Sequence, residues 1–404
     1  MTRVLSLRAG IWAAIVLVLG ILYKTYVHNI IFLTIGIGRE IQSIDDFPWT
    51  CTRLQHPLLE GCEDMWLDDQ ERKLYAACNT VDSRKGWSPG GSKLNISARS
   101  RTDHIAVLNI DQPGSDGQYG LHKLKFGGYL DDLDLHGFDV HSIEGRLRFW
   151  LINHRPPVDP TTGEFLDPRA VGANSTIEIF ELDSASETLE YVKTIASDAI
   201  ISPNNLAVDK DGLGFVITND RNAKVGTFAE LGMLIGGGSL TYCRSDTGNC
   251  HVAANKGFSF PNGIVHENGL YYVAHSVSGI VTVHKLVGDQ LIQVDKISTG
   301  YPIDNVSLDA DGNLLAAAFP DSIEFVKSME DPYRVVAPAT VLAVRGIATQ
   351  LKARNGNCEV SKLVEDRDAK WLPSSTVVVQ DVKSHRLFLG GILSPFITIC
   401  EQHI

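Results

Sequence analysis

The sequence lacks the short motifs that mark two common classes of enzyme. It has no GxSxG nucleophile elbow and no GxxxxGK(S/T) phosphate-binding loop, so serine-nucleophile chemistry has little support. It is also short of positive charge, with 36 Lys and Arg residues against 48 Asp and Glu residues and a net charge of −12. This balance argues against nucleic acid as a partner, because nucleic-acid binding depends on neutralising phosphates.

A repeated hairpin is the main pattern that the sequence does contain. Residues 302–320 begin with the pair Asp304-Asn305, continue through a short alternating strand and an Asp/Gly-rich turn, and end in an apolar strand. The same pattern of strand, turn and strand begins near residues 63, 136, 204, 262, 304 and 374. A spacing of roughly 40–75 residues is typical of four-stranded blades with loops of different length. We therefore expect an all-β fold, a six-bladed β-propeller, over residues 46–404.

The polar residues at the strand starts predict a cation site. The innermost strands of a propeller line a central channel, so residues at equivalent positions meet around one axis. The residues expected to converge are Glu63, Asn204, Asn262, Asp304 and Asn305. No cysteine or second imidazole joins them, which argues against zinc and copper, whereas carboxylate and amide oxygens suit calcium. Each Asn or Asp taken singly also favours turns, so the prediction depends on five positions in register.

The N-terminal residues 1–45 contain a continuous apolar run at 9–23, preceded by Arg3 and Arg8. The run is short for a membrane span, has the length of the apolar core of a signal sequence, and is followed by no convincing A-x-A cleavage site. We expect a retained signal-anchor helix with its basic end in the cytosol. The propeller would then lie in the secretory pathway, anchored in the endoplasmic reticulum or at the cell surface. A cleaved signal peptide, and hence a secreted protein, is the alternative.

Seven cysteines suit a secretory chain better than a cytosolic one. Cys51 precedes the first blade and Cys400 lies four residues from the end, so a bridge between them would lock the ring. Two local bridges could also form, Cys62 with Cys78 and Cys243 with Cys250, which leaves Cys358 outside a disulfide.

Two polar loops carry acceptor sequons for N-glycosylation, at Asn95 and Asn174. A third sequon begins at Asn305, which we expect to be buried and unmodified. Residues 82–102 are rich in Gly, Ser and Arg, and predict a long exposed loop, with a lid over the channel as its candidate function.

An ordered set of motifs resembles the serum paraoxonase/arylesterase family. The set comprises Glu63-Asp64, Leu135-His136-Gly137, Ile152-Asn153-His154, residues 257–264 (GFSFPNGI), residues 304–307 (DNVS), and the terminal Cys51 and Cys400. The resemblance covers roughly residues 10–404, and the order of the motifs is more specific than any one of them.

The resemblance implies a six-bladed propeller with two calcium ions stacked in its channel. The catalytic ion would be held by the five ring residues named above. The structural ion would be held by Asp64, the main-chain carbonyl of Phe138 and the side chain of Asn205. Asn205 departs from the family, in which an Asp is usual, so the structural site should be weakened.

The resemblance also implies ester or lactone hydrolysis by a histidine pair. His136 would act as general base on water, with His154 tuning it or relaying its proton, while calcium polarises the carbonyl group. Phe319 stands where the family tends to have a further pocket histidine, and near the C-terminus Ser394 and Phe396 likewise replace a histidine, so the substrate can differ. The expected activity is that of a carboxylic-ester hydrolase acting on a small lactone or aryl ester. A gluconolactonase- or strictosidine-synthase-like propeller and a non-catalytic, calcium-stabilised binding module are the alternatives.

Overall fold

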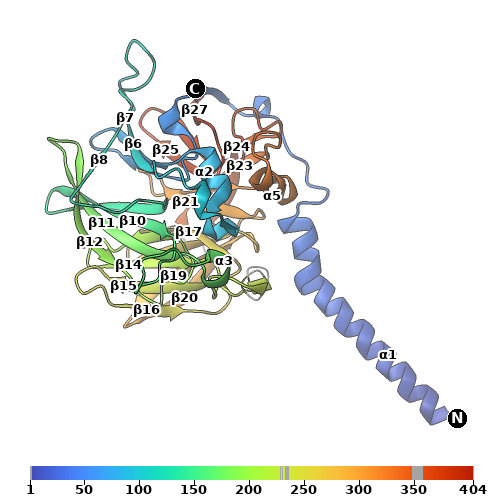
Figure 1. The fold of residues 1–404 in the computed structure, drawn as a ribbon. Helices are drawn as coiled ribbons and strands as arrows, with labels where there is room; N and C mark the ends of the chain where they lie inside the picture. Colours follow the sequence, from blue (N-terminus) through green and yellow to red (C-terminus); the bar gives the residue numbers. More distant parts are fainter. Residues whose placement is uncertain (1, 228, 230, 233–235, 348–357, 404) are drawn as a thin grey trace.

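The computed structural model describes residues 2–227, 229, 231–232, 236–347 and 358–403. Six sheets of four or five strands surround a common axis, as the blades of a propeller do (Figure 1). This arrangement confirms the predicted all-β, six-bladed fold. Each sheet begins at the axis with one strand of a predicted hairpin, at or within three residues of the expected start.

The strands of the first three blades follow one another in chain order from the axis outward, apart from one short outermost strand in blade two. Blade one has β2 (Asp64–Asp68), β3 (Lys73–Cys78), β6 (His104–Asn109) and β7 (His122–Lys123). Blade two has β9 (Leu135–Ile143), β10 (Arg146–Arg155), β11 (Asn174–Asp183), β12 (Thr188–Ile195) and the short β8 (Lys125–Gly127). Blade three has β13 (Pro203–Val208), β14 (Gly214–Asn219), β15 (Ser239–Arg244) and β16 (Cys250–Ala254).

The other three blades follow the same plan. Blade four has β17 (Pro261–Glu267), β18 (Leu270–His275), β19 (Ile280–Val287) and β20 (Gln290–Ser298). Blade five has β21 (Ile303–Leu308), β22 (Leu314–Ala318), β23 (Ala339–Arg345) and β24 (Glu359–Asp366). Blade six has β25 (Val377–Asp381), β26 (Arg386–Gly390), β27 (Ile397–Gln402) and, outermost, the N-terminal β1 (Trp49–Leu54).

Apolar side chains fill the space between neighbouring blades. Between blades one and two, the ring of Tyr75 packs edge-on against Phe149 with centroids 5.4 Å apart. Burying a side chain of this size contributes about 1.5–3 kcal/mol. Successive residues of an inner strand pack on opposite sides of their blade, as Leu206 and Val208 do on one side and Ala207 on the other, so polar residues at the start of the strand are held in fixed places around the axis.

A register shift interrupts three of the innermost hairpins where the predicted ligands lie. The pairing shifts between Pro203 and Leu206 in blade three, and blades four and five shift at residues 261–264 and 303–306. A bulge of this kind leaves residues outside the ladder and turns their side chains. It thereby lets adjacent residues such as Asn204 and Asn205 both serve the channel.

The ring is closed by pairing the two ends of the chain. Strand β1 lies antiparallel to β27, with Cys51 directly opposite Cys400. These cysteines form a disulfide, and Cys62–Cys78 and Cys243–Cys250 form two more. The three predicted pairings are therefore present, and Cys358 lies outside them.

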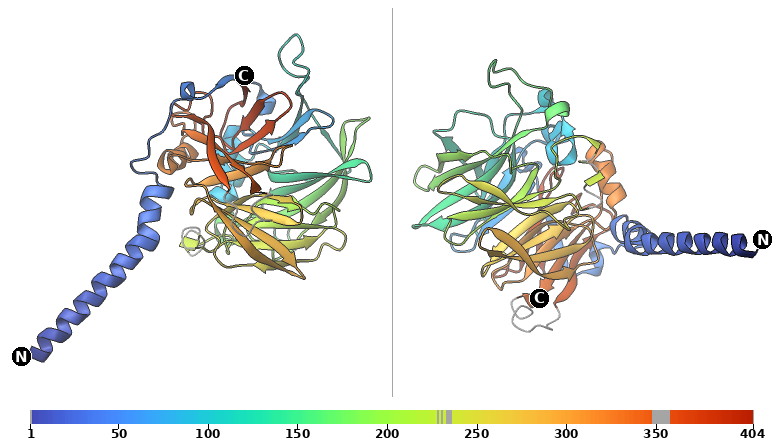
Figure 2. Two further views of the ribbon diagram at one scale, coloured as in Figure 1. Left: turned by 180° about the vertical axis from the view of Figure 1, so that it is seen from behind. Right: turned by 90° about the horizontal axis from the view of Figure 1, so that it is seen from below.

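The N-terminal segment forms helix α1 (Thr2–Leu22), which continues into the wider turns of η1 (Tyr23–Val27) and η2 (Asn29–Thr34). Figure 2 shows α1 projecting away from the ring. Its base is tied down where Arg39 donates to Pro320 O at 2.8 Å. Among the helices of the described residues, none combines the length and the apolar character needed to cross a bilayer. Membrane anchoring by this segment therefore stays a prediction.

Candidate functional site

The five ring residues predicted from the strand starts are brought together in the channel. Each of Glu63, Asn204, Asn262, Asp304 and Asn305 is at most 7% exposed. Contacts across the axis show how close they lie, since Asn305 Nδ2 of blade five donates to Glu63 Oε1 of blade one at 2.9 Å. Residues up to 242 positions apart in the sequence therefore share one buried polar centre.

Three oxygens of this centre lack hydrogen-bond partners within the described part of the chain. They are Glu63 Oε2, Asn204 Oδ1 and Asn262 Oδ1, and all are buried. A buried polar atom without a partner costs about 1–3 kcal/mol. All three belong to the predicted ligand set and are hard oxygen donors of the kind that calcium prefers. These residues therefore fit a calcium ion.

The charges of the centre also favour a bound cation. Burial raises the pKa of Glu63 to about 7, although a hydrogen bond from Asn305 opposes the shift. Burial and then the charge of Glu63 raise the pKa of Asp304 well above its usual range. Two carboxylates that disfavour one another's charge would both be stabilised by a cation between them. In the described residues no metal-binding cluster of three His, Cys, Asp or Glu occurs, and the predicted set differs from such a cluster because three of its five members are amides.

Asn305 differs from the other four predicted ligands. Its amide nitrogen faces Glu63, donating to Oε1 and to the main-chain oxygen at 3.1 Å. Its side-chain oxygen instead accepts a hydrogen bond from Asn205. In this arrangement Glu63, Asn204, Asn262 and Asp304 surround the site, and Asn305 orients Glu63.

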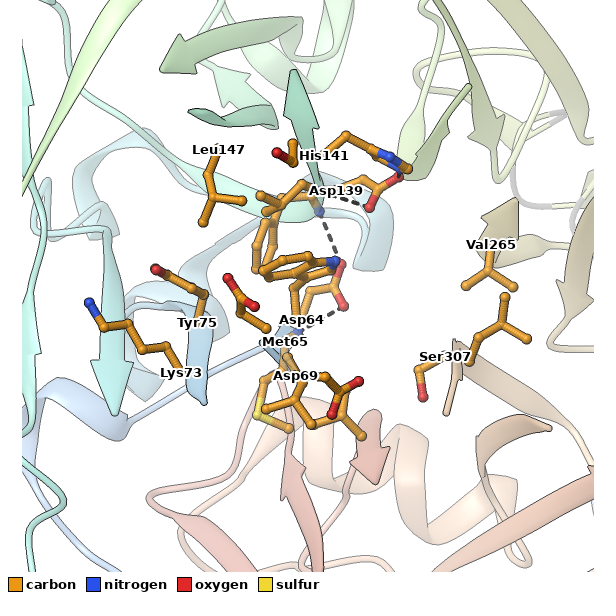
Figure 3. A pocket seen from close by; sticks show the side chains of 18 of the residues that line it. Asp64, Met65, Asp69, Lys73, Tyr75, Asp139, His141, Leu147, Val265 and Ser307 are labelled. Carbon is orange, nitrogen blue, oxygen red and sulfur yellow. Dashed lines mark hydrogen bonds and ion pairs between the residues drawn. The ribbon is translucent and has the colours of Figure 1, made fainter. Parts of the chain in front are cut away.

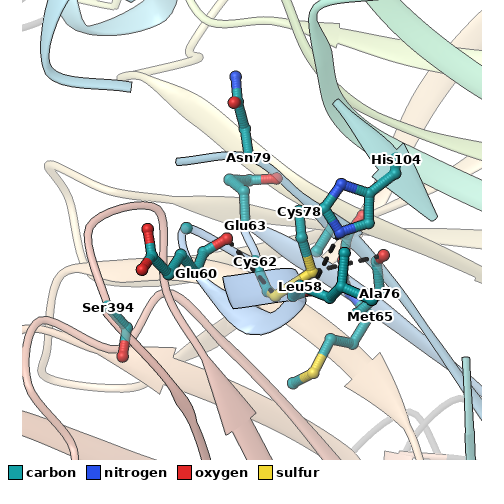
Figure 4. Close-up of a disulfide and its surroundings, with 12 residues drawn as sticks. Leu58, Glu60, Cys62, Glu63, Met65, Ala76, Cys78, Asn79, His104 and Ser394 are labelled. Atoms are coloured by element: carbon teal, nitrogen blue, oxygen red, sulfur yellow. Dashed lines mark hydrogen bonds between the residues drawn. A yellow bond between two sulfur atoms is a disulfide. The ribbon is translucent and has the colours of Figure 1, made fainter. Parts of the chain in front are cut away.

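The disulfide Cys62–Cys78 holds Glu63 in place. It joins the residue before Glu63 to the end of β3, and Figure 4 shows Glu63 beside it. The backbone N–H of Glu63 donates to Ala77 O at 3.1 Å, so the same two segments are also joined by a hydrogen bond. The carboxylate is therefore presented by a doubly fixed backbone.

The two predicted catalytic histidines lie against one another beside Glu63. Their ring centroids are 5.0 Å apart, and His136 Nε2 is 3.8 Å from Glu63 Oε1. His154 Nδ1 is 2.9 Å from Ser175 Oγ, which fixes its ring. His136 Nδ1 and His154 Nε2 have no partner among the placed residues. Burial, with a smaller effect of the Arg84 charge, lowers the pKa of His136 to about 3, so this imidazole is neutral at neutral pH.

The segment at 82–102 is not the exposed loop that the sequence predicted, because it forms short helices and strands that lie over the histidines. Its candidate function as a lid over the channel stays a prediction. Helix α2 (Val81–Gly86) buries Arg84, whose guanidinium donates to Leu135 O. Strand β4 (Trp87–Ser88) pairs with β5 (Lys93–Leu94), and the Trp87 indole donates to His154 O at 2.9 Å. The cap formed by this segment closes over a narrow polar gap with no room for a water molecule, lined by Asn79, Arg84, Trp87, Ser88, Asp103, Asp134, His136 and His154.

Sequence reasoning missed Arg84, Trp87 and Ser175 as parts of this site. Trp87 carried a usable signal, because a tryptophan in an otherwise polar segment usually packs against something. Arg84 carried none, since most arginines in such segments are solvated. Ser175 forms part of the sequon at Asn174, a pattern that predicts glycosylation and not a contact with a histidine.

A larger cavity of about 740 Å³ opens at the other end of the channel, where the inner strands end. Asp64 and Asn205 line its inner part, and Figure 3 shows Asp139 and His141 farther out. His141 Nε2 is 3.3 Å from Asp139 Oδ2. Adjacent residues on an extended chain point opposite ways, so Glu63 belongs to the histidine end and Asp64 to this one.

Solved structures with a similar fold have low sequence identity to this chain. A luciferin-regenerating enzyme is 12% identical with a TM-score of 0.47, over 87% of this chain and 95% of that one. A gluconolactonase from Xanthomonas campestris is 12% identical with a TM-score of 0.48, over 90% and 94%. Virginiamycin B lyase from Staphylococcus aureus is 8% identical with a TM-score of 0.45, over 88% and 100%. A search of curated protein sequences found no significant match.

A family profile gives a more specific result. The profile described as Arylesterase matches residues 170–394, more than half of the 404 residues. The matched region includes Asn204, Asn262 and Asp304 with the bulges that present them. The resemblance drawn from the sequence motifs is confirmed, and the chain belongs to the arylesterase family.

Proposed function

We propose that this protein is a calcium-dependent hydrolase of lactones, aryl esters or both. The observation that carries the proposal is the set of three unpartnered buried oxygens, on Glu63, Asn204 and Asn262, beside a pair of buried neutral histidines. Family membership supports hydrolysis as the class of reaction. Glu63, Asn204, Asn262 and Asp304 would hold the ion, which when bound supplies a Lewis acid for the carbonyl oxygen and its developing negative charge.

The histidines would supply the proton transfers. His136 Nε2 faces Glu63 and is the nitrogen placed to accept a proton from the attacking water. Ser175 orients His154, which can then take up a proton from the other side of the His136 ring. Water adds across the acyl C–O bond, so a lactone gives a hydroxy acid and an aryl ester gives a carboxylic acid and a phenol. Because the cap buries both rings, the segment at residues 81–102 must open for substrate to enter.

The test is hydrolysis of phenyl acetate and a panel of γ- and δ-lactones, with and without a calcium chelator. We expect turnover that chelation abolishes and added calcium restores. If the protein binds calcium and hydrolyses lactones but no aryl ester, it is a lactonase of the gluconolactonase type. If it binds calcium and hydrolyses neither, the enzymatic proposal fails and a binding module remains.

We also propose that α1 anchors the propeller to a membrane of the secretory pathway. Its side chains include Trp12, Val16 and Leu17, all about two-thirds exposed. The three disulfides and the exposed asparagines of the two sequons, Asn95 and Asn174, suit an oxidising, glycosylating compartment. We expect the full chain, made in a secretory host, to resist alkaline carbonate extraction and to lose mass on deglycosylation. Recovery of an unglycosylated, extractable protein would contradict this.

A further inference from the structure

The Asn205 side chain forms a bridge across the channel axis. It lies on β13 and is 4% exposed. Its Nδ2 donates to Asp64 Oδ2 of blade one at 3.2 Å and to Asn305 Oδ1 of blade five at 2.8 Å. One amide group therefore joins three inner strands at the level where a second, structural calcium is expected from the family resemblance.

The surrounding hydrogen bonds fix which way this amide points. Asn205 Oδ1 accepts from the backbone N–H of Leu206 at 2.7 Å, and a backbone N–H can only donate. Asn305 Nδ2 donates to two oxygens of Glu63, so Asn305 turns its own oxygen toward Asn205. Exchanging the oxygen and nitrogen of Asn205 would place N–H against N–H and oxygen against oxygen. Asn205 therefore presents hydrogens to Asp64.

The contacts of Asp64 leave little for a cation to bind. Its Oδ1 accepts from the Met65 N–H at 2.9 Å, and its Oδ2 accepts from the Phe138 N–H at 3.0 Å as well as from Asn205. A calcium ion needs six to eight oxygen ligands. The side chain of Asn205 is also confined, because a methyl group added at Gly137 would lie 2.7 Å from its Oδ1. The residues expected at the structural site therefore do not fit a second ion.

We propose that this protein binds one calcium ion in its channel, and that the Asn205 amide replaces the structural ion. Three N–H donors satisfy the single carboxylate of Asp64. An Asp at position 205, which is usual in the family, would put two buried carboxylates in contact and so require a cation. The proposal relies on the proposed function only for the first ion. What it predicts by itself is that Asn205→Asp binds one more calcium ion per chain than the wild type.

The experiment measures bound calcium per chain, by equilibrium dialysis with elemental analysis, in the wild type and in Asn205→Asp. We expect one ion in the wild type and two in the variant. The matched control is the double variant Asp64→Asn/Asn205→Asp, which keeps the wild-type charge but not the paired carboxylates, and it should bind one. Two ions in the wild type, no gain in Asn205→Asp, or an extra ion in the double variant would overturn the proposal.

The design separates this proposal from the proposed function. If the wild type binds none and Asn205→Asp binds one, the catalytic site fails while the replacement of the structural ion stands. If the wild type binds one and the variant gains none, the catalytic site stands and the replacement of the structural ion fails. Should Asn205→Asp fail to fold, a terbium titration of the wild type decides the question, since saturation at one equivalent supports the proposal and saturation at two overturns it.

Discussion

Replacing Glu63 by glutamine is expected to abolish calcium binding in the channel and to lower the rate of phenyl acetate or lactone hydrolysis about a thousand-fold, or ~4 kcal/mol. Glu63 supplies one of only two carboxylates in the set of four proposed ligands, and its Oε2 is buried without a partner. Glutamine removes that charge and adds two hydrogens that point toward any cation. Equilibrium dialysis measures the binding and initial rates at saturating substrate measure the turnover.

Two further variants show whether the loss belongs to this site. His136→Gln leaves the four ligand residues in place, so calcium affinity should stay near that of the wild type while turnover falls about 10²–10⁴-fold. Glu365→Gln makes the same chemical change at a fully buried glutamate in β24, where its partners include Thr340 and Lys362, and it should leave calcium binding unchanged. Wild-type activity in Glu63→Gln would refute the assignment of the site.

The features that could be predicted from the sequence are those that depend on local patterns of residues. A short, mostly apolar strand, a charged turn and a second apolar strand recur six times, and each copy forms the inner part of one blade. Because the copies are equivalent, residues such as Asn204 and Asp304 could be placed on one axis without any knowledge of the blade angles. Seven cysteines and their positions relative to the strands were enough to predict three pairings.

The features that could not be predicted depend on contacts between distant segments. The side-chain amide of Asn305 points its nitrogen at Glu63 because Asn205 occupies its oxygen, and neither fact is local. The cap is another case, since a segment rich in Gly, Ser and Arg normally stays solvated. It folds inward because Trp87 finds a carbonyl acceptor at His154, on a strand from the next blade.

Replacing both Cys51 and Cys400 by serine is expected to destabilise the propeller by about 5–6 kcal/mol if the loss follows the chain entropy of the opened loop. The two cysteines are 349 residues apart, so their bond constrains nearly the whole unfolded chain. Strand β1 still pairs with β27 in the variant, but it is then held only by its ladder and its packing. The matched control is the double serine variant of Cys243 and Cys250, which are seven residues apart and whose loss should cost only about 2 kcal/mol. Urea unfolding followed by tryptophan fluorescence gives both values, and equal losses in the two variants would show that the ring does not depend on its covalent closure.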